Sequence, residues 1–274
     1  MKRSALRNVL LLLICFLLAA ALLAGCAESS LPDATPSSPS AEDASPSTTE
    51  ESKEQEEMAS EEDKTQEETI DPVRAYYETK CAAFSVMNAN LSKGQIVFVG
   101  DSITDLCPLD DYYADLPLAS YNRGIGGDTT VGLLARMGVS LYDLAPSKIV
   151  LMIGVNDVNC GADNETTLAN YAAILRGIKE NLPDAEVYCM SVISENDVLE
   201  RMVGLNVESN MLKILSLNPS LKSLAESFGY TYVDLYSAVS DENDRLKYEY
   251  SDDGIHLNAA GFAVWASVIK PYLR

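Results

Sequence analysis

Histidine occurs once in the 274 residues of this chain, as His256 in the stretch SDDGIHLNAAG (251–261). An imidazole exchanges protons near neutral pH and can therefore act as a general base. Asp253 lies three residues earlier, from where its carboxylate can reach back to hold the ring in one tautomer and stabilise the imidazolium. Asp252 is a second candidate for this role, although the spacing favours Asp253. The stretch predicts a base and its orienting acid.

A serine hydroxyl is a poor nucleophile until a base takes its proton, and Ser102 in GDSIT (100–104) is the candidate. The stretch NRGIGGDTT (122–130) contains glycines, whose backbone N–H groups can approach a ligand closely. GVND (154–157) adds an amide donor, Asn156. Backbone and amide donors aimed at one point stabilise a developing oxyanion, so the motifs together indicate acyl transfer.

Short apolar runs alternate with helical periodicity along the chain, which predicts a mainly parallel sheet covered by helices on both faces. Pro219 is expected to break or kink the helix predicted over 206–229. The predicted strands are 94–100, 118–124, 147–154, 185–192 and 230–235, and the predicted helices are 129–144, 165–182, 206–229 and 258–273.

The four motifs occupy comparable places in this alternation. GDSIT, NRGIGGDTT and GVND follow the first three strands, and the segment with His256 comes after the fifth. Ligands of open parallel sheets bind beyond the carboxyl ends of the strands. The motifs are weak individually because each could be an ordinary turn. Their order, with each at a predicted strand end, favours one common site.

At this point the sequence resembles the SGNH (GDSL) hydrolases, which carry serine, glycine, asparagine and histidine in separate blocks in this order. The similarity extends over about residues 94–274, and GIGGDTT and DGIHLNAAGFAVWA look closest to the branch of platelet-activating-factor acetylhydrolase-like esterases. The resemblance implies a flavodoxin-like three-layer α/β/α sandwich with a five-stranded mainly parallel sheet. One stretch, SVISENDVLERMVGLN (191–206), departs from the proline-containing loop of related chains.

The resemblance also implies roles for individual residues. Ser102 would be the nucleophile, with Asp253 and His256 completing a catalytic triad. The oxyanion would be held by the N–H groups of Ser102 and Gly127 and by the side chain of Asn156. No cofactor is implied.

The first 26 residues have the pattern of a secretory signal, with Lys2, Arg3 and Arg7 before an apolar run. The run ends in LAGC, which resembles the lipobox of bacterial lipoproteins and implies lipidation of Cys26. An ordinary secretory signal or an uncleaved anchor is the alternative. The expected location is the outer face of a bacterial membrane, to which Cys26 would anchor the chain.

Residues 27–72 contain 15 acidic and 2 basic residues and almost no large apolar ones, so we expect a disordered linker. Of the chain's formal charge of −21, −13 lies in this linker and −11 in residues 73–274, the predicted hydrolase domain. A domain of that charge argues against binding to nucleic acid or to strongly anionic substrates.

A metal site is not expected, because one histidine and scattered cysteines do not form a ligand set. An exported protein could form one or two disulfides, but the sequence does not indicate their pairing. The four cysteines of the predicted domain are Cys81, Cys107, Cys160 and Cys189.

These patterns favour an extracytoplasmic serine esterase, and the resemblance implies a short-acyl ester as substrate, such as an O-acetyl group on a glycan or a small lipid ester. Two alternatives stay open. The same residues could transfer an acyl group to a sugar hydroxyl, or the chain could be a non-catalytic ligand-binding lipoprotein.

Overall fold

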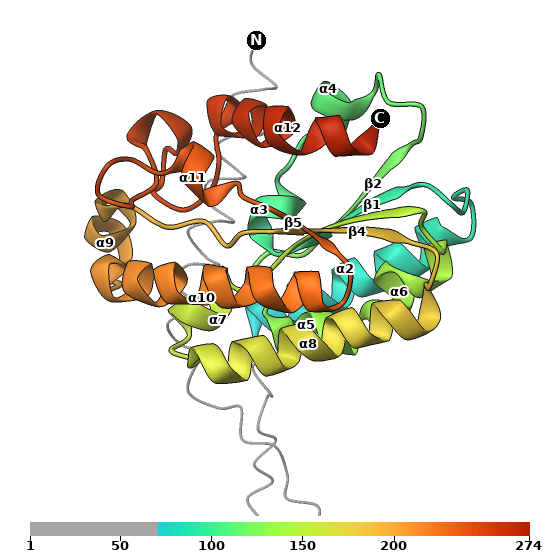
Figure 1. The fold of residues 1–274 in the computed structure, drawn as a ribbon, viewed down its shortest axis with the longest axis horizontal. Coiled ribbons are helices and arrows are strands. Elements are labelled where there is room, and N and C mark those ends of the chain that lie inside the picture. The colour runs from blue at the N-terminus through green and yellow to red at the C-terminus, as the bar shows by residue number, and fades with distance from the viewer. Residues whose placement is uncertain (1–70) are drawn as a thin grey trace, which may run out of the picture.

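The computed structural model describes residues 71–274. Its centre is a sheet between layers of helices (Figure 1). The sheet has five strands in the order β2-β1-β3-β4-β5, and every neighbouring pair of strands is parallel. All five predicted strands are present, each within two residues of its predicted ends. Their bounds are β1 Ile96–Gly100, β2 Ser120–Gly124, β3 Lys148–Met152, β4 Glu186–Met190 and β5 Thr231–Val233.

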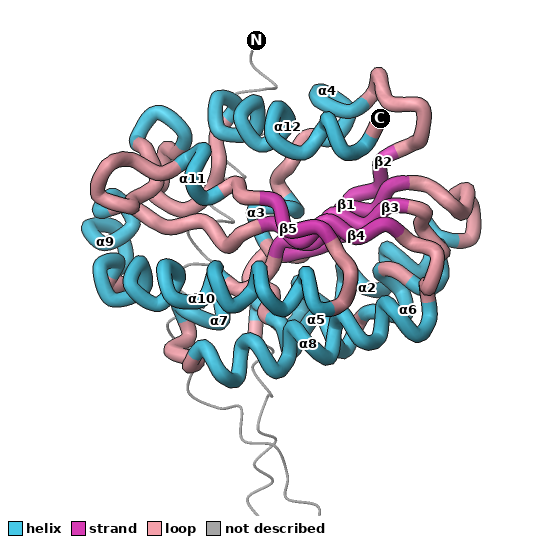
Figure 2. Tube along the Cα trace, in the orientation of Figure 1, coloured by secondary structure: helices cyan, strands magenta, loops and turns pink. Residues whose placement is uncertain are grey.

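Helices cover both faces of the sheet, as Figure 2 shows, and confirm the predicted three-layer sandwich. One layer contains α4 (Leu109–Tyr113), α11 (Tyr236–Val239) and α12 (Ala259–Leu273). The opposite layer contains α2 (Pro72–Asn88), α5 (Thr130–Ala135), α6 (Met137–Ser140), α8 (Asn164–Asn181) and α10 (Val207–Ser227). Shorter helices lie near strand ends and in loops: α3 (Ser102–Asp105), α7 (Val155–Asn159), α9 (Asp197–Val203), and the 3₁₀ turns η1 (Tyr142–Leu144) and η2 (Tyr248–Tyr250).

The core lies between the sheet and these two layers. Every residue of β1 is buried, as expected for a strand covered on both faces. Trp265 of α12 is fully buried and packs at an angle against Phe98 of β1. Cys189 of β4 is also fully buried, and no disulfide joins the four cysteines to one another within residues 71–274.

The prediction of one helix over 129–144 is wrong. The segment forms α5, α6 and η1, and the first interruption is at Arg136, which has φ −112° and ψ 10°. The Arg136 side chain is buried and donates four hydrogen bonds, two of them to carbonyl oxygens of the sheet and two to the side chains of Asp128 and Ser140. These hydrogen bonds outweigh the loss of a regular helix at Arg136, because burying a guanidinium without partners is very costly.

Two further differences concern helices. α10 continues through Pro219, so of the predicted break or kink the break is absent. α2 was not predicted at all, although Asp71 at its N-cap and Pro72 at its first position are ordinary signals for a helix start. Both residues lie within the predicted linker, 27–72.

The predicted signal segment, Cys26 and most of the predicted linker lie outside the described residues. Within the part of the chain that is described, no helix is both long and apolar enough to cross a membrane.

Candidate active site

The site lies at the carboxyl end of the sheet, where the polypeptide turns sharply after β1. Gly100 ends β1 so close to β3 that an added Cβ would lie 2.0 Å from the Met152 carbonyl oxygen. Asp101 then caps α3 by accepting a hydrogen bond from the Ile103 N–H. Ser102 is therefore the first residue of α3, and its N–H has no partner within that helix.

The structure brings Ser102 together with the distant His256 and Asp253. The distance from His256 Nε2 to Ser102 Oγ is 2.9 Å, and that from His256 Nδ1 to Asp253 Oδ2 is 2.6 Å. His256 can accept the serine proton at Nε2 while Nδ1–H donates to the carboxylate. The side chains of His256 and Asp253 are each 18% exposed, so solvent reaches the site.

Asp253 is held by the loop that carries the histidine. Its Oδ1 accepts hydrogen bonds from the N–H groups of Ile255 and His256 and from the Ser251 hydroxyl. Burial alone would raise the pKa of Asp253, but the hydrogen bond and charge of His256, with these N–H groups, lower it to about 2. Asp252 instead accepts a hydrogen bond from Asn258. Of the two aspartates, only Asp253 has a hydrogen bond to the imidazole.

The two other predicted motifs meet beside this triad-like arrangement. Asn156, in α7 after β3, is buried and donates one amide hydrogen to the Asp128 carbonyl oxygen at 2.8 Å. Its second amide hydrogen can serve another acceptor. Gly127 has φ +77°, a conformation that strains other residues, and no acceptor for its N–H occurs among residues 71–274.

Buried polar contacts join these motifs to each other. Asp157 accepts hydrogen bonds from the N–H and hydroxyl of Thr130, which ties the asparagine motif to the start of α5. Arg136 donates to the Asp128 carboxylate at 2.7 Å, to the Gly100 carbonyl at the end of β1 and to the Arg123 carbonyl in β2. The ends of three elements are thereby fixed relative to one another.

Burial perturbs the acids around this network. Desolvation raises the pKa of Asp101 to about 7, despite the Ile103 N–H. It also raises the pKa of Asp128 to about 6, against the opposing charge and hydrogen bond of Arg136. The pKa of Asp157 is raised by the same cause. Strongly perturbed carboxyl groups gathered at one strand edge are typical of functional sites.

The structure brings the predicted residues Ser102, Asp253 and His256 together, but the sequence does not predict the residues packed behind them. Arg136, Asp157 and Thr130 were not proposed for any role. A lone charge in the apolar stretch LLARMG was the available signal for Arg136. Arg123, also buried, packs its guanidinium over the Phe84 ring at 4.6 Å and therefore has a packing role.

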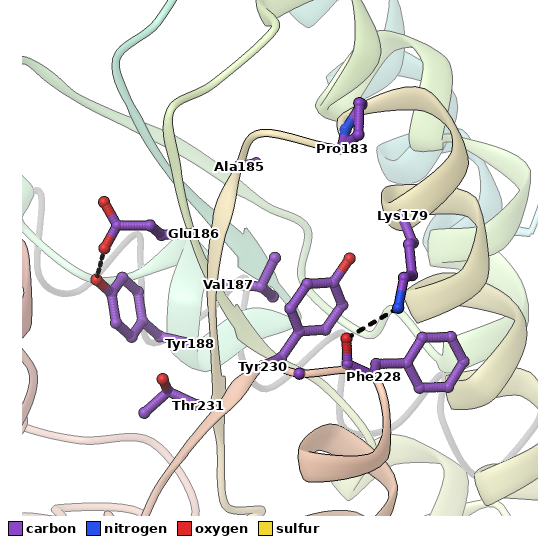
Figure 3. A pocket seen from close by; sticks show the side chains of 10 residues that line it. Lys179, Pro183, Ala185, Glu186, Val187, Tyr188, Phe228, Tyr230 and Thr231 are labelled. Atoms are coloured by element: carbon purple, nitrogen blue, oxygen red, sulfur yellow. Dashed lines mark hydrogen bonds between the residues drawn. The ribbon is translucent and has the colours of Figure 1, made fainter.

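Two other candidates within residues 71–274 are a metal site and a pocket at the opposite end of the sheet. No three metal-ligating side chains gather in that region. A pocket of about 330 Å³ (Figure 3) lies at the amino ends of β4 and β5. Ser102 follows the carboxyl end of β1 and does not line this pocket. Its Lys179 donates to the Phe228 carbonyl oxygen, and Glu186 accepts from the Tyr188 hydroxyl.

A serine hydroxyl backed by a histidine and a carboxylate, at the carboxyl end of a parallel sheet, is the arrangement of an α/β serine hydrolase. A model of the GDSL-like lipase/acylhydrolase family matches residues 98–264, more than half of the sequence. The chain belongs to this family and is a serine ester hydrolase.

Individual relatives agree with this assignment. The chain is 28% identical over 181 residues to platelet-activating factor acetylhydrolase IB subunit alpha2 of Gallus gallus, covering 64% of this chain and 73% of that protein. The human subunit alpha2 is 27% identical over 192 residues, with 68% and 77% covered.

Solved structures show the same fold. A candidate platelet activating factor protein from Streptococcus pneumonia superposes with a TM-score of 0.68 and 28% identity, covering 74% of this chain and 94% of that chain. A GDSL-like lipase from Bacteroides thetaiotaomicron gives 0.62 and 24%, with 70% and 96% covered. The predicted family and fold class are confirmed.

Proposed function

We propose that the chain hydrolyses a short-acyl carboxylic ester through a covalent acyl-enzyme on Ser102. The observation that carries the proposal is the continuous hydrogen-bond chain from Asp253 through His256 to Ser102, with distances of 2.6 and 2.9 Å. Relatives whose names specify an acetylhydrolase, at 25–28% identity, support a short acyl group. The alcohol would belong to a glycan or a small lipid.

In the acylation step, Ser102 Oγ attacks the ester carbonyl carbon while His256 Nε2 takes the hydroxyl proton. The carbonyl oxygen becomes an oxyanion that accepts from the N–H groups of Ser102 and Gly127 and from the Asn156 amide. When the tetrahedral intermediate collapses, its bond to the alcohol oxygen breaks and His256 donates the proton to the leaving alcohol.

Deacylation repeats the sequence with water as the nucleophile. His256 takes a proton from water as its oxygen attacks the acyl carbon, and returns a proton to Ser102 Oγ as the acid leaves. Asp253 stays ionised throughout, because its pKa is about 2 and its role is to hold the imidazolium.

A fluorophosphonate probe, which forms a covalent bond with an activated serine, tests this function on the full chain. We expect labelling and release of acid from p-nitrophenyl acetate in the wild type, and neither in Ser102→Ala. Comparison of acetyl with octanoyl esters tests the acyl preference, and added oligosaccharide as acceptor separates hydrolysis from transfer. An unlabelled wild type, or labelling that persists in Ser102→Ala, would disprove the mechanism.

The place of action belongs to the same proposal. Cys26 at the end of LAGC would be lipidated and would hold the domain at the outer face of a bacterial membrane. The support is the sequence pattern alone. Labelled palmitate should enter the wild type but not Cys26→Ala, and equal incorporation into both would exclude this anchor.

A further inference from the structure

The carboxylate of Asp105, the last residue of α3, joins three separate parts of the molecule. Its Oδ2 accepts from the Gly126 N–H at 3.1 Å and from the Tyr76 hydroxyl at 2.7 Å. Its Oδ1 accepts from Lys80 Nζ at 2.7 Å. The side chain is only 12% exposed, so these contacts are largely shielded from water.

The contact with Gly126 matters because the next residue is Gly127. On the other side of Gly127, the Asp128 N–H donates to the Ile125 carbonyl and the Asp128 carbonyl accepts from Asn156. Both neighbours of Gly127 are therefore held by hydrogen bonds, whereas its own N–H has no acceptor among residues 71–274. This arrangement leaves one donor available and fixes the loop on either side of it.

Asp105 also belongs to the same single helical turn as Ser102. The Asp105 N–H donates to the Asp101 carbonyl at 2.9 Å, and an added Cβ on Gly124 would lie 2.1 Å from the Asp105 nitrogen. The nucleophile and the glycine loop are thus connected through a short, closely packed path. A displacement of Asp105 would change the distance between Ser102 and the Gly127 N–H.

Helix α2 supplies the other two contacts to Asp105 and lies before the family match at 98–264. Tyr77 of this helix donates to the Gly132 carbonyl at 2.8 Å, and Val73 lies 3.2 Å from the position of a Cβ added to Gly127. The helix therefore packs along the loop that carries the free N–H, in addition to holding Asp105.

We infer that Asp105, held by Tyr76 and Lys80 of α2, is the positioning residue that sets the Gly127 N–H against the oxyanion formed on Ser102. The inference rests on the proposed function, in which Gly127 is an oxyanion donor. It makes α2 a support of the active site. A shift of about 1 Å in such a group can lower a rate about 10²-fold.

The test measures kcat, KM and the concentration of active sites by fluorophosphonate titration, using the full chain. For Asp105→Ala we expect kcat per titrated site to fall about 10- to 100-fold with KM changed less than about threefold, because the lost contact acts mainly in the transition state. Affinity for an alkyl boronic acid, which forms an anionic tetrahedral adduct with the serine, should fall by a similar factor.

Four further variants separate positioning from general stability. Tyr76→Phe should lower kcat about threefold, as expected for loss of one hydrogen bond. Glu78→Gln is the matched control, since it removes an exposed ion pair with Arg74 on the same helix and should leave kcat unchanged. Asp105→Asn should lower kcat per titrated site, because its amide nitrogen would face the Lys80 ammonium. In the double variant with Lys80→Gln, the glutamine carbonyl oxygen can accept from that amide, which should restore much of the rate.

The possible results are distinguishable. If Asp105→Ala only reduces the fraction of molecules that titrate, with wild-type kcat per site and wild-type boronate affinity, Asp105 has a structural role and the inference is wrong. The proposed function then stands. If the wild type itself does not titrate, the proposed function and the inference that rests on it both fail.

Discussion

The two ends of the parallel sheet differ in what their polar groups leave unpaired. At the carboxyl end, Asp105, Asp128 and Asn156 form hydrogen bonds that hold the backbone around Gly127, while its N–H has no acceptor among the described residues. At the amino end, Lys179 and Glu186 in the pocket of Figure 3 are bonded to groups beside them. The first end leaves a backbone donor without an acceptor among the described residues, whereas these two side chains at the second end already have partners.

Aromatic packing strengthens this contrast. The rings of Phe228 and Tyr230 are stacked with centroids 6.2 Å apart, and Lys179 Nζ lies 5.9 Å from the Phe228 ring centroid. The pocket is therefore lined by groups that already satisfy one another. A cavity alone is poor evidence for an active site, whereas an oriented donor without a partner, next to a nucleophile and its base, is good evidence.

The largest expected effect tests the assignment of the acid at the carboxyl end. Asp253→Asn should lower kcat about 10⁴-fold, because an amide no longer fixes the reactive tautomer of His256. Asp252→Asn, one residue away, should stay within about threefold of wild type, as expected for a site without contact to the imidazole. Steady-state kinetics on p-nitrophenyl acetate measure both. Equal losses in the two variants would mean that the choice between them is wrong.

A smaller effect should appear in stability, because the pKa values of two acids at the same edge are shifted in opposite directions, that of Asp101 upwards by burial and that of Asp253 downwards by His256 and backbone N–H groups. The pKa of Asp101 is raised to about 7 in the folded state, against about 3.9 in an unfolded chain. Between these values the folded state binds more protons, so the wild type loses stability as the pH rises from 5 to 7. The pKa of Asp253 is lowered to about 2, so its contribution is complete at pH 5 and is lost only in acid.

Thermal unfolding at pH 5 and pH 8 separates these cases. Asp101→Asn keeps an oxygen that can accept from the Ile103 N–H and should gain about 5 °C in Tm, relative to wild type, between pH 5 and pH 8. Asp253→Asn should lower Tm by the same amount at both pH values. A Tm difference for Asp101→Asn that does not change with pH would show that Asp101 is ionised in the folded protein across this range.

How much of this structure can be predicted from the sequence depends on how many residues separate the partners of each contact along the chain. The five strands follow from local apolar runs, and their carboxyl ends share an edge once the sheet is parallel, so the positions of Ser102, Asn156 and His256 could be predicted together. The pairing of His256 with Asp253 is also local, because three residues separate them in a single loop.

The supporting layer could not be predicted in the same way. Tyr76 meets Asp105 across 29 residues, and Asp105 meets Gly126 across 21, through side chains whose types have many ordinary surface roles. Only one residue of α2, Phe84, is buried, so its apolar pattern is weak. Arg136 interrupts an otherwise convincing helical period for contacts that exist only after the sheet has formed.

The smallest expected effects compare the two ends directly, using lysines in similar settings. Lys80 bonds Asp105 and lies 5.3 Å from the centroid of the Phe84 ring, and Lys179 bonds the Phe228 carbonyl and lies 5.9 Å from its ring. Each is changed to glutamine. Both substitutions remove a charge from an aromatic face, which should lower stability by about 1 kcal/mol or less, and Lys80→Gln also removes the ion pair with Asp105.

Only the change at the carboxyl end should alter catalysis. Lys80→Gln weakens the support of Asp105 and should lower kcat per titrated site about threefold, whereas Lys179→Gln should leave it unchanged. Chemical denaturation of both variants confirms that their stabilities match, so that a difference in kcat reflects position in the fold. If Lys179→Gln lowers kcat as much as Lys80→Gln, the amino end is coupled to the reaction and the two ends do not divide function as their hydrogen bonds indicate.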